Sequence, residues 1–165
     1  MKRTKSDLLR LVAELDSDFD LLKTLKQKNE RAWRRVGQDS SEELDWAALG
    51  YTIHNIYNLF ENYFLRISKF FENSLEPLSW HRDLIEHMRL DIDGVRPALL
   101  NRDLATRIDE LRSFRHVFRN TYQSELDPKR VELVQKQLDP TLSAFNKAHK
   151  EFLKKLRTVA GQLED

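Results

Sequence analysis

Apolar residues recur at every third or fourth position along most of the chain, which is the spacing of an amphipathic helix. The first helical segment carries them at Leu8, Leu11, Val12, Leu15, Phe19, Leu22 and Leu25. The same spacing predicts helices over residues 5–35, about 41–73, about 79–90, about 103–122 and 128 to about 162, with a bend or interruption at Pro140. No segment shows the alternation typical of a strand. We therefore predict an all-α protein, an antiparallel bundle of about five helices.

The boundaries of these helices are marked by residues with special backbone properties. Gly37 predicts the usual glycine cap at the end of the first helix. Ser40-Ser-Glu-Glu43 has the pattern of a capping box, which opens the second, aromatic-rich helix. Pro77 breaks the chain, and the glycine and proline within residues 91–97 predict a loop. Asp127-Pro128 is a strong start signal for the last helix.

The fourth predicted helix departs from the amphipathic pattern near its end, in Phe114-Arg-His-Val-Phe-Arg-Asn-Thr-Tyr122. At about 100° per residue, the sector that begins with Leu104 and Ile108 ends with polar residues. These are Arg115, Arg119 and Tyr122, with Arg112 at the edge. Charged residues are almost never fully buried unless they are paired. Arg115 must therefore face a carboxylate, a partner subunit, or a cleft that receives an anion.

His116 and Asn120 form a second row on the flank of this helix, one turn apart. An arginine's planar fork suits phosphate, and histidine titrates near neutrality and can move protons. This combination indicates an anion-binding site. The alternative is a solvated helix end whose arginines pair with Asp109 or Glu110 of the same helix.

Two further polar clusters are candidates. The first is the row His54, Asn58, Glu61 and Asn62 on the second helix. By itself it is better explained as an exposed polar face; in the functional interpretation, Glu61 pairs with Arg115 or Arg119 across the bundle. The second is Trp80-His-Arg82, where a helix N-terminus favours anions and Trp80 could stack on a base. An apolar anchor is the slightly favoured explanation for Trp80.

Composition narrows the class of protein. The 165 residues include 28 basic and 27 acidic ones, so a net charge of +1 argues against binding DNA by bulk charge. No cysteine is present, which excludes disulfides and thiolate metal sites. No signal peptide and no apolar stretch of about 18 residues is recognisable. We expect one cytoplasmic domain over residues 1–165, without membrane contact. His87 and His149 lack partners at metal-ligand spacing, so we expect no metal and no cofactor.

The nonapeptide resembles the active-site motif of HEPN-domain ribonucleases, specifically the HepT-like toxins. Their pattern is arginine, a polar residue, three positions, histidine, one position, tyrosine. In this chain these fall on Arg115, His116, Asn120 and Tyr122. The segment His54-Asn-Ile-Tyr-Asn-Leu-Phe-Glu61 looks like the family's second-helix segment, with its acidic residue at Glu61. Trp80-His-Arg-Asp-Leu-Ile is similar to a segment of one subgroup, so the resemblance covers roughly residues 40–135.

The resemblance implies a HEPN-like bundle that dimerises about a two-fold axis, with the two motif helices facing a shared cleft. It also implies RNA cleavage without metal. For this chain we expect Arg115 and Arg119 to bind the phosphate, His116 to transfer protons and Asn120 to act as a positioning residue. We expect Arg112, Glu61 and His81 to bind the substrate. The implied partner is a minimal nucleotidyltransferase antitoxin of the MNT type, which would AMPylate Tyr122.

The chain departs from the family motif where Asn120 replaces the catalytic histidine, because an amide cannot exchange a proton in this role. Three accounts stay open. His116 supplies the acid–base group from a shifted position; the domain binds RNA, nucleotide or a partner without cleaving; or the asparagine is an inactivating substitution. The first is preferred, because the rest of the motif is intact.

Overall fold

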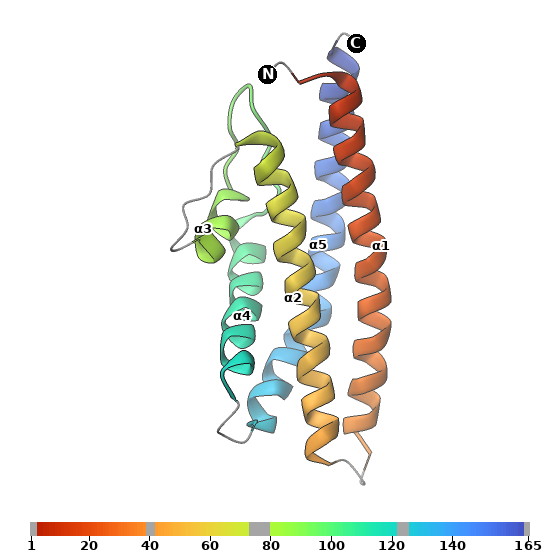
Figure 1. The fold of residues 1–165 in the computed structure, drawn as a ribbon, viewed down its shortest axis with the longest axis vertical. Coiled ribbons are helices and arrows are strands. Elements are labelled where there is room, and N and C mark those ends of the chain that lie inside the picture. The colour runs from red at the N-terminus through yellow and green to blue at the C-terminus, as the bar shows by residue number, and fades with distance from the viewer. Residues whose placement is uncertain (1–2, 39–41, 73–79, 122–125, 164–165) are drawn as a thin grey trace.

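The computed structural model describes residues 3–38, 42–72, 80–121 and 126–163, apart from the side chains of Trp80 and Arg82. Figure 1 shows a bundle of helices in this part of the chain. The helices are α1 (Lys5–Val36), α2 (Glu43–Phe71), α3 (Trp80–His87), α4 (Arg102–Arg119) and α5 (Pro128–Gln162). Over the described residues the only β-type pairing is an isolated bridge between Ile92 and Arg96. The predicted all-α fold is confirmed.

The long helices α1, α2 and α5 form the body of the bundle, and the shorter α3 and α4 lie along one side of it (Figure 1). Because α1 and α4 run opposite to α2 and α5, the C-terminal end of α4 lies beside the N-terminal half of α2. Among the described residues, no helix combines the length and apolar character needed to cross a bilayer.

The core is built around the aromatic face of α2. Tyr57, Phe60, Tyr63 and Phe64 are all buried there, and Phe145 of α5 packs among them. The rings of Phe60 and Phe145 meet edge to face with centroids 4.7 Å apart. Offset and edge-to-face aromatic pairs stabilise a core beyond their area alone. The predicted aromatic side of the second helix is therefore its buried side.

Two of the predicted caps need correction. Gly37 does end α1, but with φ −72° rather than the left-handed backbone expected of a glycine cap. Its N–H reaches the Trp33 carbonyl in a final helical turn. The box at the start of α2 is shifted by two residues: the Asp45 carboxylate accepts from the backbone N–H of Glu42 at 2.8 Å, whereas Ser40 lies outside the described residues. The Asp127 cap is confirmed, since its carboxylate accepts from the N–H of Lys129.

Helix α4 is shorter than predicted and ends at Arg119 instead of Tyr122. The side chain of Asn120 donates to the carbonyl of His116 at 2.8 Å, and the hydroxyl of Thr121 donates to the carbonyl of Phe118 at 2.7 Å. Side chains that bond local carbonyls compete with helix continuation. Tyr122 lies outside the described residues.

Helix α3 ends at His87, before the predicted boundary at Leu90, because the loop that follows folds back over it. The Arg96 guanidinium is buried and donates to the carbonyls of His87 and Leu90. It also pairs with Glu72 at the end of α2, at 2.6 Å. In the loop itself, Gly94 adopts φ +70°, a conformation that glycine favours. The bend or interruption predicted at Pro140 does not break α5, which is one continuous helix through it.

Candidate functional site

A basic cavity of about 430 Å³ lies where the start of α3 faces the last turns of α4. Its lining residues are His81, Arg112, Arg115, His116, Arg119 and Asn120. We call it the arginine cavity. Five of these residues belong to the C-terminal part of α4 and its cap, which is the segment that broke the amphipathic pattern in the sequence.

Arg115 is held by a buried carboxylate. Its Nη1 donates to Oε2 of Glu61 at 2.9 Å, and the two side chains are only 14% and 9% exposed. The guanidinium also lies over the ring of Tyr57, 5.4 Å from its centroid. The predicted pairing across the bundle is confirmed. The exposed-face interpretation is wrong for Glu61, although Asn62 beside it is exposed.

Glu61 also binds His81. The same Oε2 accepts from Nδ1 of His81 at 2.6 Å, so one carboxylate oxygen joins α2 to both α3 and α4. Burial, followed by the charge and hydrogen bond of Glu61, raises the pKa of the Tyr57 hydroxyl, which stays protonated. The Nε of Arg115 is buried and has no hydrogen-bond partner within the part of the chain that the structure describes. Buried N–H groups normally have a partner.

Arg112 pairs with an acidic residue of its own helix, as one of the two interpretations of the sequence expected. Its Nε donates to Asp109 of the same helix at 2.7 Å. This hydrogen bond raises the pKa of the guanidinium above its ordinary value, so Arg112 remains charged where it lines the cavity. Arg112 thus pairs with a carboxylate of its own helix, as the solvated-helix alternative expects. It also lines the cavity, as the anion-site interpretation expects.

The three remaining α4 residues of the cavity are exposed. His116, Arg119 and Asn120 lie at the end of the helix, where a ligand can reach them. The amide nitrogen of Asn120 is 3.5 Å from Nε2 of His116, as well as capping that residue's carbonyl. Asn120 stands where the resemblance places a motif histidine. It contacts His116, which is the histidine of the nonapeptide.

The other members of the polar row on α2, His54, Asn58 and Asn62, do not line the cavity. His54 is partly buried, and its Nε2 is 3.0 Å from the amide nitrogen of Asn58. Burial is the main cause that lowers the pKa of His54, and the charges of Arg115 and Arg119 lower it further. His54 is therefore a neutral ring that supports the α2–α4 contact.

Some residues that the sequence singled out lie outside the described part of the chain. The side chains of Trp80 and Arg82 and the whole of Tyr122 lie outside them. Within the described ranges, no group of three histidine, aspartate or glutamate side chains has the arrangement of a metal site.

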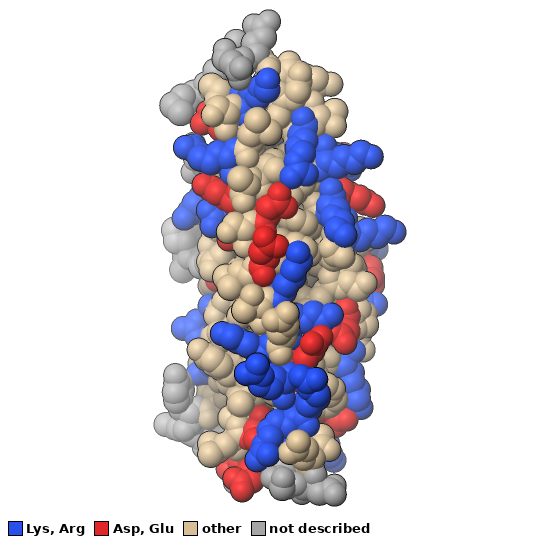
Figure 2. Space-filling model, turned by 90° about the vertical axis from the view of Figure 1, so that its right-hand side faces the viewer, with Lys and Arg blue, Asp and Glu red and all other residues tan. Residues whose placement is uncertain are grey.

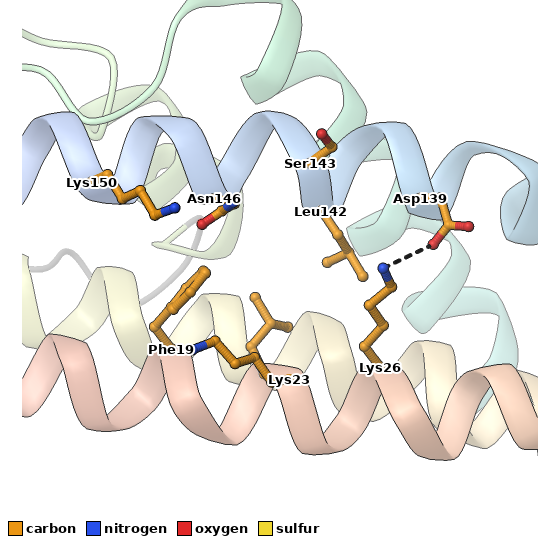
Figure 3. A pocket seen from close by; sticks show the side chains of 9 residues that line it. Phe19, Lys23, Lys26, Asp139, Leu142, Ser143, Asn146 and Lys150 are labelled. Atoms are coloured by element: carbon orange, nitrogen blue, oxygen red, sulfur yellow. Dashed lines mark ion pairs between the residues drawn. The ribbon is translucent and has the colours of Figure 1, made fainter.

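A second hollow, which the sequence did not indicate, lies between α1 and α5. This lysine groove has a volume of about 390 Å³. Lys23, Lys26 and Lys150 reach over an apolar floor that includes Phe19 (Figure 3). Lys26 pairs loosely with Asp139 at 3.7 Å. Figure 2 shows that basic and acidic side chains are interspersed on this side of the molecule.

These features define a helical-bundle protein with an arginine- and histidine-lined cavity at the end of one helix. The model of the HepT-like protein family matches residues 48–156 of the chain, which is most of its length. The chain belongs to this HepT-like family. Searches of curated proteins and of solved structures found no match. The matched residues include every residue that lines the arginine cavity, whereas α1 precedes them.

Proposed function

We propose that the protein is a metal-independent RNA endonuclease that acts as a HepT-like toxin. One observation carries the proposal: three arginines and two histidines line a single cavity, and the most buried of the arginines is held there by Glu61. Two carboxylates pair with these three guanidinium groups, Glu61 with Arg115 and Asp109 with Arg112, so positive charge remains in excess. The cavity is therefore suited to an anion of the size and charge of a phosphodiester.

The arginines suit the cleavage step as well as binding. Negative charge on the phosphate oxygens grows in the transition state, and fixed cations aimed at that charge are usually the largest catalytic contribution. Arg115 is fixed, because Glu61 and the Tyr57 ring hold it from two sides. Arg119 is exposed and can reach the flanking phosphate. Arg112, held by Asp109, adds a third positive charge to the cavity wall.

Proton transfer is best served by a side chain that titrates near neutrality, and His116 is the histidine within the motif. It is exposed at the cavity and Asn120 contacts it. A positioned acid–base group contributes about 10²–10⁴-fold to the rate. We assign proton transfer to His116 and its positioning to Asn120.

The test is cleavage of a mixed RNA pool by the purified chain in excess EDTA. We expect cleavage without divalent metal, and a loss of about 10²-fold or more on Arg119→Ala, since single charge-stabilising donors are worth about 10²–10³-fold. Arg107→Ala is the matched control, because Arg107 lies on α4 and pairs with Asp103 away from the cavity. An absolute need for Mg²⁺, or equal rates for the two variants, contradicts the proposed mechanism.

The toxin role adds a regulator and a dimer. In this proposal the chain is a cytoplasmic homodimer neutralised by an MNT-type nucleotidyltransferase, which AMPylates Tyr122. The supporting observation is membership of the HepT-like family together with the tyrosine two positions after Asn120. An adenylate there would bring negative charge toward Arg115 and Arg119. Co-expression with such a nucleotidyltransferase, followed by mass spectrometry, should show an adenylate on Tyr122. Neutralisation with an unmodified tyrosine contradicts this part.

A second candidate is a non-catalytic HEPN dimer that binds RNA, a nucleotide or a nucleotidyltransferase partner. The asparagine at position 120 favours it, because the family motif has its proton-transfer histidine there. Asn120→His separates the two candidates. A variant that cleaves while the parent chain only binds RNA supports the non-catalytic candidate, and cleavage by the parent chain excludes it.

A further inference from the structure

We propose that His81 is a second proton-transfer residue in the arginine cavity, acting as a general acid, and that Glu61 is its positioning residue. This inference rests on the proposed RNA-cleaving function. It adds a catalytic group from α3, outside the motif helix, to a site for which the sequence suggested only a substrate-binding role at position 81.

The orientation of the His81 ring is the first observation. Its Nδ1 is 2.6 Å from Oε2 of Glu61, and the Glu61 side chain is almost fully buried. The hydrogen bond of one ring nitrogen determines which nitrogen is left for chemistry. With Nδ1 donating to Glu61, proton exchange with a bound molecule falls to Nε2. The ring itself lines the cavity.

The rigidity of the support is the second observation. Glu61 lies in the middle of α2, and its second contact, to Arg115, ties His81 and the phosphate-binding arginine to the same oxygen atom. Helix α3 is short, but Leu84 and Ile85 on its inner side are completely buried. A catalytic group needs such neighbours to hold it within a fraction of an ångström of its working position.

The positions of the two histidines assign the acid role to His81, because His116, which we assign as the base, lies on α4, whereas His81 lines the cavity from α3. Among the described groups, Glu61 of α2 contacts His81, and Arg112, Arg115 and Arg119 of α4 line the same cavity. The carboxylate of Glu61 is in direct contact with Nδ1 of His81, and it offsets part of the positive charge that the arginines bring to the cavity. Asn120 lies next to the other histidine, with its amide nitrogen 3.5 Å from Nε2 of His116.

The resulting reaction balances without any other reagent. The 2′-hydroxyl oxygen attacks the phosphorus atom and gives its proton to His116. The O2′–P bond forms as the P–O5′ bond breaks, and Nε2 of His81 gives a proton to the departing 5′ oxygen. The products are a 2′,3′-cyclic phosphate and a 5′-hydroxyl end. Exchange with water then returns both histidines to their starting protonation states.

A leaving-group experiment tests this role. An RNA oligonucleotide is compared with the same oligonucleotide in which sulfur replaces the 5′ bridging oxygen at the mapped cleavage site. A thiolate departs without a proton, so it makes a general acid unnecessary. We expect His81→Ala to slow cleavage of the oxygen substrate by about 10²–10⁴-fold, and to slow cleavage of the sulfur substrate far less.

Glu61→Gln should show the same preference for the sulfur substrate, more weakly, because it acts through His81. His87→Ala is the control, since His87 is on the same helix but does not line the cavity. The ratio of the two rates within one variant does not depend on how much of that variant is folded. Equal losses on both substrates, or no loss, overturn the inference while leaving the proposed function intact. If the parent chain cleaves neither substrate, the proposed function fails and this inference fails with it.

Discussion

The arginine cavity and the lysine groove have similar volumes, about 430 and 390 Å³, and cations line both of them. They differ in what holds those cations. Arg115 is 14% exposed and bound to a buried carboxylate, whereas Lys23 and Lys26 are 63% and 43% exposed and pair with surface acids. Exposed pairs of this kind contribute little free energy, and salt screens them. Fixed charge, rather than the amount of charge, distinguishes the arginine cavity from an ordinary solvated face.

The largest effect is expected when charge is removed from each region in turn and RNA cleavage is measured. Arg115→Ala should lower cleavage by at least about 10²-fold, because it removes a fixed cation from the transition state. The triple change of Lys23, Lys26 and Lys150 to alanine removes more charge, yet it should change the rate by less than about twofold at physiological salt, because exposed charges are screened there. A larger loss in the triple variant than in Arg115→Ala would invert the comparison.

The next largest effect should be on the free energy of unfolding, when the pair between Arg115 and Glu61 is broken. Arg115→Met alone leaves the Glu61 carboxylate buried with His81 as its remaining partner, and we expect the free energy of unfolding to fall by about 3 kcal/mol, at the lower end for a broken buried pair. Adding Glu61→Leu should restore part of this loss, since replacing both partners is often neutral. Cleavage should stay lost in the double variant. Urea unfolding and cleavage rates, measured together, separate a structural pair from a functional one.

The close contact between α2 and α4 gives a smaller effect. A Cβ at Gly50 would meet the Phe118 ring at 2.7 Å, whereas a Cβ at Gly161 meets nothing. Gly50→Ala should lower the free energy of unfolding by about 1–3 kcal/mol through overpacking, and should lower cleavage because it shifts the end of α4. Gly161→Ala should stabilise the protein by about 0.5–1 kcal/mol through helix propensity. Equal thermal shifts for the two variants would mean that Phe118 swings aside freely.

The smallest expected effect is a pH dependence of the free energy of unfolding, which comes from His149 beside the lysine groove. His149 stacks on Phe19 of the groove and lies between Tyr63 and Asp16. Burial lowers the pKa of His149 below the ordinary histidine value of 6.5, although Asp16 opposes this. The unfolded chain therefore takes up a proton first as the pH falls. Stability from the neutral ring is fully present above about pH 6.5 and is lost below it.

His149→Gln removes this dependence. The difference in free energy of unfolding between the parent chain and the variant should be constant above pH 6.5 and should shrink below it. Cleavage at pH 7.5 should be unchanged, since His149 is not in the arginine cavity. A difference that grows as the pH falls would show that Asp16 stabilises the charged ring more than burial destabilises it.

The predictable parts of this molecule are those set by local pattern. The spacing of apolar residues is enough to find the long helices. An arginine in line with Leu104 and Ile108 is enough to predict that it faces a carboxylate, a partner subunit or an anion-binding cleft, and the structure shows a carboxylate, Glu61. The end of α4 was misplaced, because the side chains of Asn120 and Thr121 take local carbonyls in a way that periodicity does not encode.

The parts that could not be predicted depend on contacts between distant segments. Arg96 looks like an ordinary loop residue in the sequence. In the structure it is buried, and it binds Glu72 and two backbone carbonyls. His149 showed no useful spacing to another ligand, because its partners, Tyr63 and Asp16, come from two other helices. The contact of His81 with Glu61 belongs to the same class.

The most direct test of the central claim, that the arginine cavity receives the RNA phosphate, is a crystal structure of the full chain with a 2′-O-methyl oligonucleotide, which cannot be cleaved. Our account predicts a phosphodiester within hydrogen-bonding distance of Arg115 and Arg119, with His116 beside the 2′ oxygen and His81 beside the 5′ oxygen. An oligonucleotide bound along the lysine groove, with the arginine cavity empty, would contradict it.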